Sequence, residues 1–157
     1  MNAMNLFFQR SHTYVVNRPI DQVKNRLTWI VTRRWDDFSM DLVGRLQQDG
    51  EFSLTKKFGL TSLEWIDDTP AYIRGTLDGK ESGTNIRIVT EPNRYMVSFF
   101  YLLMGLFLVE LLEWETMIPL EKNLKIGILA ATCGLLLVVM YLFSNNIRKR
   151  FEQLMQL

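Results

Sequence analysis

The sequence predicts an α+β protein: a small antiparallel sheet with one amphipathic helix, followed by a two-helix transmembrane hairpin. Two observations support this prediction. The C-terminal third contains two apolar runs without charge, residues 95–109 and 126–143, whereas the first two-thirds are rich in charged residues and turn signals. With the residues beside them, the runs reach the roughly 18 to 20 residues that a helix needs to cross a hydrocarbon core about 30 Å thick.

The first predicted elements are a strand and a helix. The β-branched and aromatic segment 11–16 is typical of a strand and ends at Asn17-Arg18-Pro19. Pro19 suits the first turn of a helix. Apolar residues then recur every three or four positions, which predicts an amphipathic helix ending near Trp35. These apolar residues are Ile20, Val23, Leu27, Ile30 and Val31.

Four further strands are predicted in two hairpins. Alternating residues over 40–46 and 52–58 flank Asp49-Gly50, and Asp-Gly between two such runs is a strong hairpin signal. The second hairpin consists of 72–77 and 86–90, joined by a turn over 78–83. The irregular segment 59–70 is predicted to be a loop with room for a short strand. The predicted order is therefore β-α-β-β-β-β.

These elements divide the chain into three parts. Residues 1–93 form a cytoplasmic α+β domain, 94–144 form the hairpin with spans at about 95–112 and 126–143, and 145–157 form a basic amphipathic tail. We expect the tail to continue the second helix along the cytoplasmic leaflet. Its apolar residues Phe151, Leu154 and Met155 would enter the membrane interface or pack under the soluble domain.

The charges beside the spans predict the orientation. Arg87 and Arg94 precede the first span and Arg148-Lys149-Arg150 follow the second, whereas the connecting loop carries three glutamates against two lysines. Cationic flanks remain on the cytoplasmic side. The N-terminal segment lacks the apolar length of a secretory signal. We therefore expect a two-pass protein of the bacterial inner membrane with both termini in the cytoplasm.

Composition argues against several function classes. The chain has 18 Lys+Arg and 17 Asp+Glu, so it lacks the basic surplus of a nucleic-acid-binding protein. Its single cysteine, Cys133, and its single histidine, His12, supply neither a metal-ligand set nor a catalytic triad. The acidic pairs 36–37 and 67–68 fit turns and caps better than catalysis. We expect no enzymatic activity, cofactor or metal.

The predicted hairpin carries two features that bear on assembly. Four small residues of the second span lie on one helix face, where another helix can approach closely, and Gly105 of the first span could meet them. This small-residue stripe consists of Gly127, Ala130, Ala131 and Gly134. Its partner is either the first span of the same hairpin or another subunit. Glu110 is expected at the far interface, with an ion path as the alternative.

Two resemblances follow from short motifs. A strand followed by Pro19-Ile20-Asp21-Gln22-Val23 is similar to the start of START-like (SRPBCC) domains. This resemblance implies a curved antiparallel sheet that wraps a long helix around an apolar ligand cavity. We expect the C-terminal helix of that fold to be absent, because the chain enters the membrane where the helix should come.

The chain also resembles uncharacterised small bacterial membrane proteins in which a compact sheet domain precedes a transmembrane hairpin. This second resemblance implies no activity. It is carried by Phe58, Ile73-Arg74-Gly75, Gly83-Thr84-Asn85-Ile86 and Pro92-Asn93.

Together these observations predict a non-enzymatic, membrane-tethered binding or assembly module whose cytoplasmic domain docks a protein partner or an apolar or lipid ligand. The alternative is an oligomeric membrane effector or channel-like protein with a cytoplasmic sensing domain. The expected partners are membrane lipid and either a second copy or another protein. The candidate docking face consists of Phe52, Leu54, Trp65 and Tyr72, and the candidate lipid-headgroup ligands are Arg94, Arg148, Lys149 and Arg150.

Overall fold

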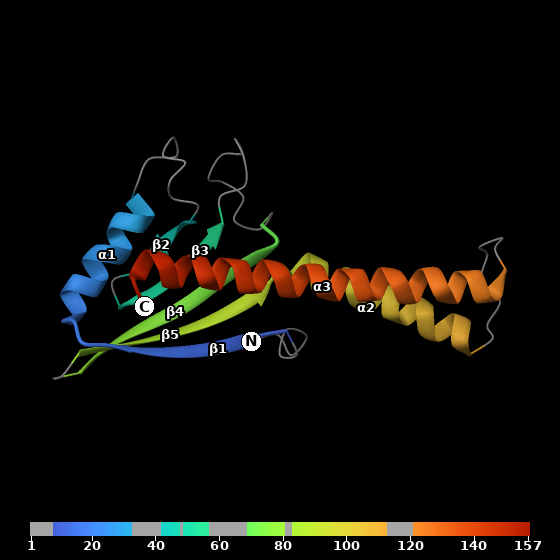
Figure 1. Ribbon diagram of the computed structural model, residues 1–157, viewed down its shortest axis with the longest axis horizontal. Coiled ribbons are helices and arrows are strands. Elements are labelled where there is room, and N and C mark those ends of the chain that lie inside the picture. Colours follow the sequence, from blue (N-terminus) through green and yellow to red (C-terminus); the bar gives the residue numbers. More distant parts are fainter. Residues whose placement is uncertain (1–7, 33–41, 48, 57–68, 81–82, 113–120) are drawn as a thin grey trace.

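The structure is a computed structural model that describes residues 8–32, 42–47, 49–56, 69–80, 83–112 and 121–157. Five strands and three helices occur among these residues (Figure 1). In chain order they are β1 (Arg10–Val16), α1 (Ile20–Thr32), β2 (Leu42–Leu46), β3 (Glu51–Lys56), β4 (Ala71–Lys80), β5 (Gly83–Pro92), α2 (Arg94–Leu111) and α3 (Lys122–Met155).

The five strands form one antiparallel sheet in the order β1-β5-β4-β3-β2. This confirms the predicted α+β class and the order β-α-β-β-β-β. Gly50 has a φ of +89° in the turn between β2 and β3, a conformation that glycine adopts readily. The predicted helix end near Trp35 and most of the predicted loop at 59–70 lie outside the described residues.

The sheet has one covered face and one open face. Alternate residues of the strands point towards α1 and the C-terminal part of α3 and are almost fully buried, among them Leu54, Ile73 and Ile88. The intervening residues, such as Arg74 and Arg87, are exposed. Figure 1 shows α1 and the end of α3 on the same side of the sheet. The domain core therefore lies between the sheet and these two helices.

Helix α3 runs through two environments without a break. Its first part contains the predicted second span, and its last turns contribute Ile147, Phe151, Leu154 and Met155 to the domain core. The apolar residues of the tail thus pack under the soluble domain, one of the two placements expected for them. The expectation that a START-like C-terminal helix is absent was wrong. No glycine or proline interrupts residues 135–155, so the helix continues past the apolar run.

One aromatic contact fixes the end of α3 on the sheet. The ring of Phe151 stacks on that of Phe52, with centroids 5.8 Å apart and planes 15° apart. The Phe52 ring in turn covers Gly75, where an added Cβ would lie 2.2 Å from a ring carbon. A side chain at position 75 would therefore displace Phe52, and with it the surface that receives Phe151.

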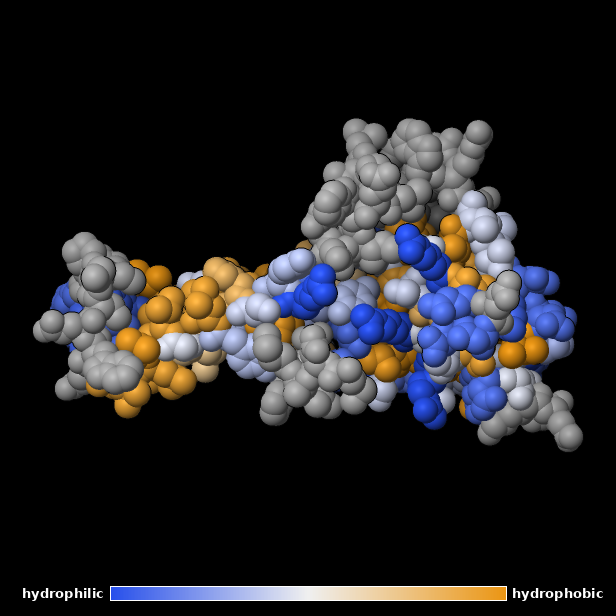
Figure 2. All heavy atoms as spheres, turned by 180° about the vertical axis from the view of Figure 1, so that it is seen from behind, coloured by the Kyte–Doolittle hydropathy of each residue, from blue (hydrophilic) through white to orange (hydrophobic). Residues whose placement is uncertain are grey.

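Helices α2 and α3 extend from the domain as an arm. They pack on each other through Val97, Phe100, Cys133 and Met140, but most of their other apolar side chains are exposed. Leu135 is 66% exposed and Leu102 is 60% exposed, and the arm is predominantly orange in Figure 2. Both helices are long and apolar enough to cross a membrane. An exposed apolar surface of this extent marks a contact with a membrane or with another protein.

The buried end of α3 leads to a stability prediction. Phe151→Ala should lower the free energy of unfolding of the domain by about 3–5 kcal/mol, because the side chain is fully buried and a cavity remains. The measurement is urea unfolding of the detergent-solubilised full chain, followed by tryptophan fluorescence. Phe99→Ala is the matched control, since Phe99 is half exposed on the arm. Equal effects of the two substitutions would contradict the packing of α3 on the sheet.

Candidate functional site

A cavity of about 170 Å³ opens at one end of the domain, where β1 ends, α1 begins and α3 ends. Its lining is part apolar and part polar, and it includes two arginines but no acidic side chain. The apolar residues are Val16, Val23, Ile86, Met155 and Leu157, and the polar residues are Arg18, Gln22, Arg26 and Gln156. A cavity with this lining suits a small molecule that has an apolar part and a polar end.

Hydrogen bonds hold the walls of this cavity. The hydroxyl of Thr84 donates to the carbonyl of Arg18 at 2.8 Å, which ties the β1–α1 connection to β5. The Nε of Arg26 donates to the carbonyl of Leu154 at 3.1 Å and joins α1 to the last turn of α3. Gln156 then takes a left-handed conformation that ends the helix. Three separate elements are thus fixed around one opening.

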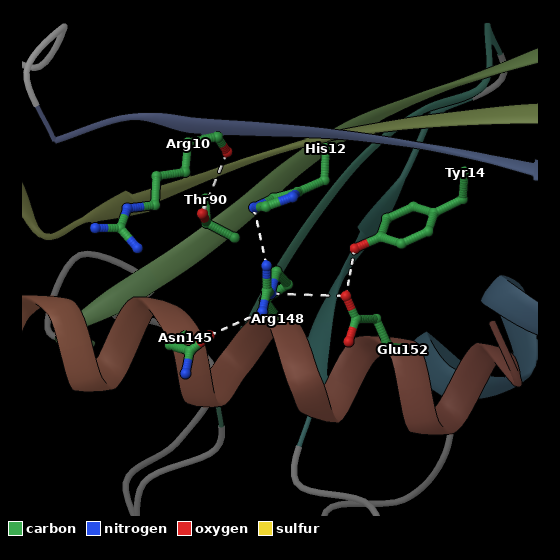
Figure 3. Close-up of polar contacts among 7 residues, drawn as sticks. All are labelled: Arg10, His12, Tyr14, Thr90, Asn145, Arg148 and Glu152. Carbon is green, nitrogen blue, oxygen red and sulfur yellow. Dashed lines mark hydrogen bonds and ion pairs between the residues drawn. The ribbon is translucent and has the colours of Figure 1, made fainter.

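A row of polar side chains joins β1 to α3 (Figure 3). We call it the β1–α3 polar row, and it consists of His12, Tyr14, Asn145, Arg148 and Glu152. Arg148 donates from Nη1 to Nε2 of His12 at 3.3 Å and from Nη2 to Oδ1 of Asn145 at 3.0 Å, and its Nε lies 3.6 Å from a carboxylate oxygen of Glu152. Tyr14 donates its hydroxyl to Glu152. The row therefore attaches an edge strand to the helix.

The surroundings of this row shift the pKa values of two of its side chains. Burial lowers the pKa of His12, and the adjacent Arg148 guanidinium lowers it further. Burial raises the pKa of Tyr14, as does its hydrogen bond to Glu152. His12 is thus held neutral, as a hydrogen-bond acceptor for Arg148. Among the described residues no group of three His, Cys, Asp or Glu side chains could hold a metal ion.

The candidate docking residues lie in different places. Phe52 and Leu54 are buried in the core, beneath the end of α3. Tyr72 lies on the opposite face of the sheet, where burial and a hydrogen bond to Glu91 raise its pKa to about 12. Trp65 lies outside the described residues. Phe52, Leu54 and Tyr72 therefore do not form one surface, because neighbouring strand residues alternate between faces.

The candidate lipid-headgroup ligands also lie in different surroundings. Arg94 is exposed at the start of α2, with its guanidinium carbon 5.3 Å from the centre of the Tyr95 ring. Lys149 is exposed, and Arg150 donates to the side chain of Gln153 at 3.3 Å. Arg148 instead turns into the β1–α3 polar row.

An arginine that the sequence did not indicate lies at the base of the arm. Arg10 at the start of β1 stacks over Tyr141 at 4.4 Å, near the end of the apolar run. A cation and an aromatic ring at this level are typical of a membrane interface.

The small-residue stripe on α3 faces away from α2. Gly127, Ala130, Ala131 and Gly134 are all exposed. A Cβ added at Gly105, Gly127 or Gly134 would meet nothing within 4 Å. The contact between the helices uses Cys133, Leu136 and Met140 instead. In the structure the stripe therefore does not pack against α2 of the same chain, which was one of the two partners considered for it.

Glu110 forms an ion pair between the two helices of the arm. Its carboxylate lies 3.4 Å from Nζ of Lys125, and both side chains are largely buried. The pair joins the C-terminal turn of α2 to the N-terminal turn of α3, at the end of the arm farthest from the domain. A paired charge at this place fits the interfacial position expected for Glu110.

Comparison with known proteins identifies no family. No family model and no curated protein matches the chain. Among solved structures it is similar to the solution NMR structure of the Polyketide_cyc-like protein Cgl2372 from Corynebacterium glutamicum. The identity is 11%, the match covers 89% of this chain and 93% of that chain, and the TM-score is 0.35. A TM-score this low carries no argument about function.

The neutral state of His12 leads to a pH prediction. The folded-state pKa lies below the ordinary value of 6.5, so the unfolded chain takes up the proton first. The contribution of His12 is thus present above pH 6.5 and is lost as the pH falls towards the folded-state pKa. Between pH 6.5 and the folded-state pKa, the free energy of unfolding should fall more steeply with decreasing pH in the wild type than in His12→Gln, whose amide oxygen still accepts from Arg148. Thr13→Gln, on the open face, should keep the wild-type slope. Equal slopes for wild type and His12→Gln would contradict the assignment.

Proposed function

We propose that the chain is a non-enzymatic, membrane-tethered binding module whose cytoplasmic domain takes a small apolar or amphiphilic ligand in the cavity at the end of α3. The observation that carries the proposal is the cavity itself, whose walls come from α1, the sheet and the last turn of α3. The same unbroken helix provides the second candidate membrane span. Ligand site and membrane anchor thus share one rigid element.

The size of the cavity limits the ligand. Its volume is about 170 Å³. An apolar cavity of about 150 Å³ is large enough to bind benzene. One ring or a short chain therefore fits, whereas a membrane lipid with two acyl chains does not. This narrows the expected ligand class from lipids in general to small amphiphiles.

The position of the cavity points to the same class. Met155 lies 12 residues beyond Phe143, the end of the apolar run, which corresponds to about 18 Å along a helix. The headgroup layer of a bilayer is only about 5–8 Å thick on each side. A lipid in the membrane would have to leave the bilayer to reach the cavity, so the ligand comes from the aqueous side.

The arm supports membrane insertion. Its apolar side chains are exposed along α2 and the first part of α3, and Arg10 with Tyr141 and Arg94 with Tyr95 lie where it meets the domain. Cations and aromatic rings at the end of an apolar segment are typical of the headgroup level. We place this end, and with it the domain, on the cytoplasmic side of the bacterial inner membrane.

An oligomeric effector is the second candidate, and one observation favours it. The small-residue stripe of α3 is exposed and unused within the chain. Such a surface lets a helix of another copy approach closely. Two helices of one chain do not enclose a path through a membrane, so an effector of this kind requires several copies.

Binding is tested by NMR of the full chain in nanodiscs with ¹³C-methyl-labelled methionine. Titration with 1-hexanol or hexanoate should shift the methyl resonance of Met155, which lines the cavity. Gln22→Trp should abolish the shift, because the indole fills the opening from an exposed lining position. Asn25→Trp, exposed on the same helix but outside the cavity, should leave it unchanged. If neither probe shifts Met155, the proposed function is wrong.

The orientation is tested by labelling single cysteines in intact cells. In a Cys133→Ala background, Thr116→Cys should react with an impermeant maleimide and Asp49→Cys should not, because the first position lies in the loop between the spans and the second in the domain. Lysed cells provide the control, in which Asp49→Cys must react. Reaction of Asp49→Cys in intact cells would place the domain outside the cytoplasm.

A further inference from the structure

We propose that the ligand of this cavity carries an anionic head, a carboxylate or phosphate, which Arg18 and Arg26 bind while its short apolar part lies against Val16, Val23 and Met155. The inference rests on the proposed function, since it names the ligand class of the same site.

The charge of the lining is the first argument. The cavity has two guanidinium groups, two side-chain amides and no acidic side chain. Among the described residues neither Arg18 nor Arg26 forms an ion pair. Both arginines line the same opening, so an anion bound there is attracted by two positive charges. An anionic ligand therefore fits the site better than a neutral one of the same shape.

The second argument is that Arg26 is positioned in advance. Its Nε is held by the Leu154 carbonyl at 3.1 Å, and its guanidinium carbon lies 4.7 Å from the centre of the Trp29 ring. Both contacts leave the two terminal nitrogens of the group for a ligand. A fixed, planar guanidinium binds carboxylate or phosphate through two parallel hydrogen bonds. Fixing the group beforehand also lowers the entropy lost on binding.

The third argument is that the polar and the apolar residues lining the cavity differ in exposure. Arg18, just before α1, and Gln22, in its first turn, are exposed and Arg26 is half-buried, whereas Val23, Ile86 and Met155 are buried. The charged side chains thus lie towards solvent and the apolar ones towards the core. A ligand in this orientation keeps its head partly hydrated, which avoids the cost of burying a charge completely.

The experiment compares two probes with similar chains, hexanoate and 1-hexanol, in the full chain in nanodiscs of neutral lipid. The Met155 methyl resonance reports binding, and those of Met96 and Met104 on α2 report partitioning into the bilayer. Hexanoate should bind at least about tenfold more tightly than 1-hexanol, the effect expected of a charge-assisted hydrogen bond. Its affinity should also fall with added salt while that of 1-hexanol does not.

The double variant Arg18→Gln/Arg26→Gln should bind hexanoate no more tightly than it binds 1-hexanol. Arg45→Gln/Arg74→Gln, which removes two exposed charges from the sheet, is the matched control and should bind both probes as the wild type does. If the arginine variant fails to fold, the salt dependence of hexanoate binding to the wild type still tests whether the ligand has an anionic head.

Three results would overturn the inference. Equal affinities of the two probes would contradict the anionic head while leaving the proposed function intact. Absence of any Met155 shift would overturn both. A Met155 shift in nanodiscs of anionic lipid without added probe, competing with hexanoate, would show that the anion is a membrane headgroup and contradict a ligand from the aqueous side.

Discussion

The structure depends on one continuous helix, α3, whose two parts lie in different surroundings. The first part of α3 exposes leucines and valines along the arm, and its last turns bury Ile147, Phe151 and Leu154 against the sheet. The contact of Phe151 with Phe52, over a glycine that leaves room for the ring, fixes this arrangement. Without the end of α3, the inner face of the sheet would be open to water at a cost of about 25 cal/mol per Å² of apolar surface.

The two polar features of the domain follow from the same helix. Its side towards β1 carries Arg148 and Glu152, which attach the edge strand, and its end closes the cavity beside α1. A tilt of the arm cannot be absorbed by a flexible linker, because residues 135–155 contain neither glycine nor proline. Met155 at the cavity and the apolar side chains of the arm therefore lie on one continuous helix.

The sequence predicted the elements that depend on local pattern. Alternation located the strands, Asp49-Gly50 located a turn, and the charge-free runs located the two apolar helices. What it did not predict depends on distant residues. The spacing of Ile147, Phe151 and Leu154 between basic residues fits an interfacial helix as well as a core helix, and only the sheet decides between them. His12 and Arg148 are 136 positions apart, and no pattern within either segment indicates the contact. The same is true of Val16 and Met155 in the cavity.

The most direct test of this account is the distance between spin labels at Leu135 and Gln153, both exposed on α3, in a Cys133→Ala background in nanodiscs. A continuous helix places their Cα atoms about 27 Å apart, and electron–electron dipolar spectroscopy should give a narrow distribution near that value. A helix that bends at the membrane surface to lie along the leaflet would bring them to about 19 Å. A shorter or broad distribution would show that the end of α3 does not lie on the sheet, and would remove the basis for both the cavity and the polar row.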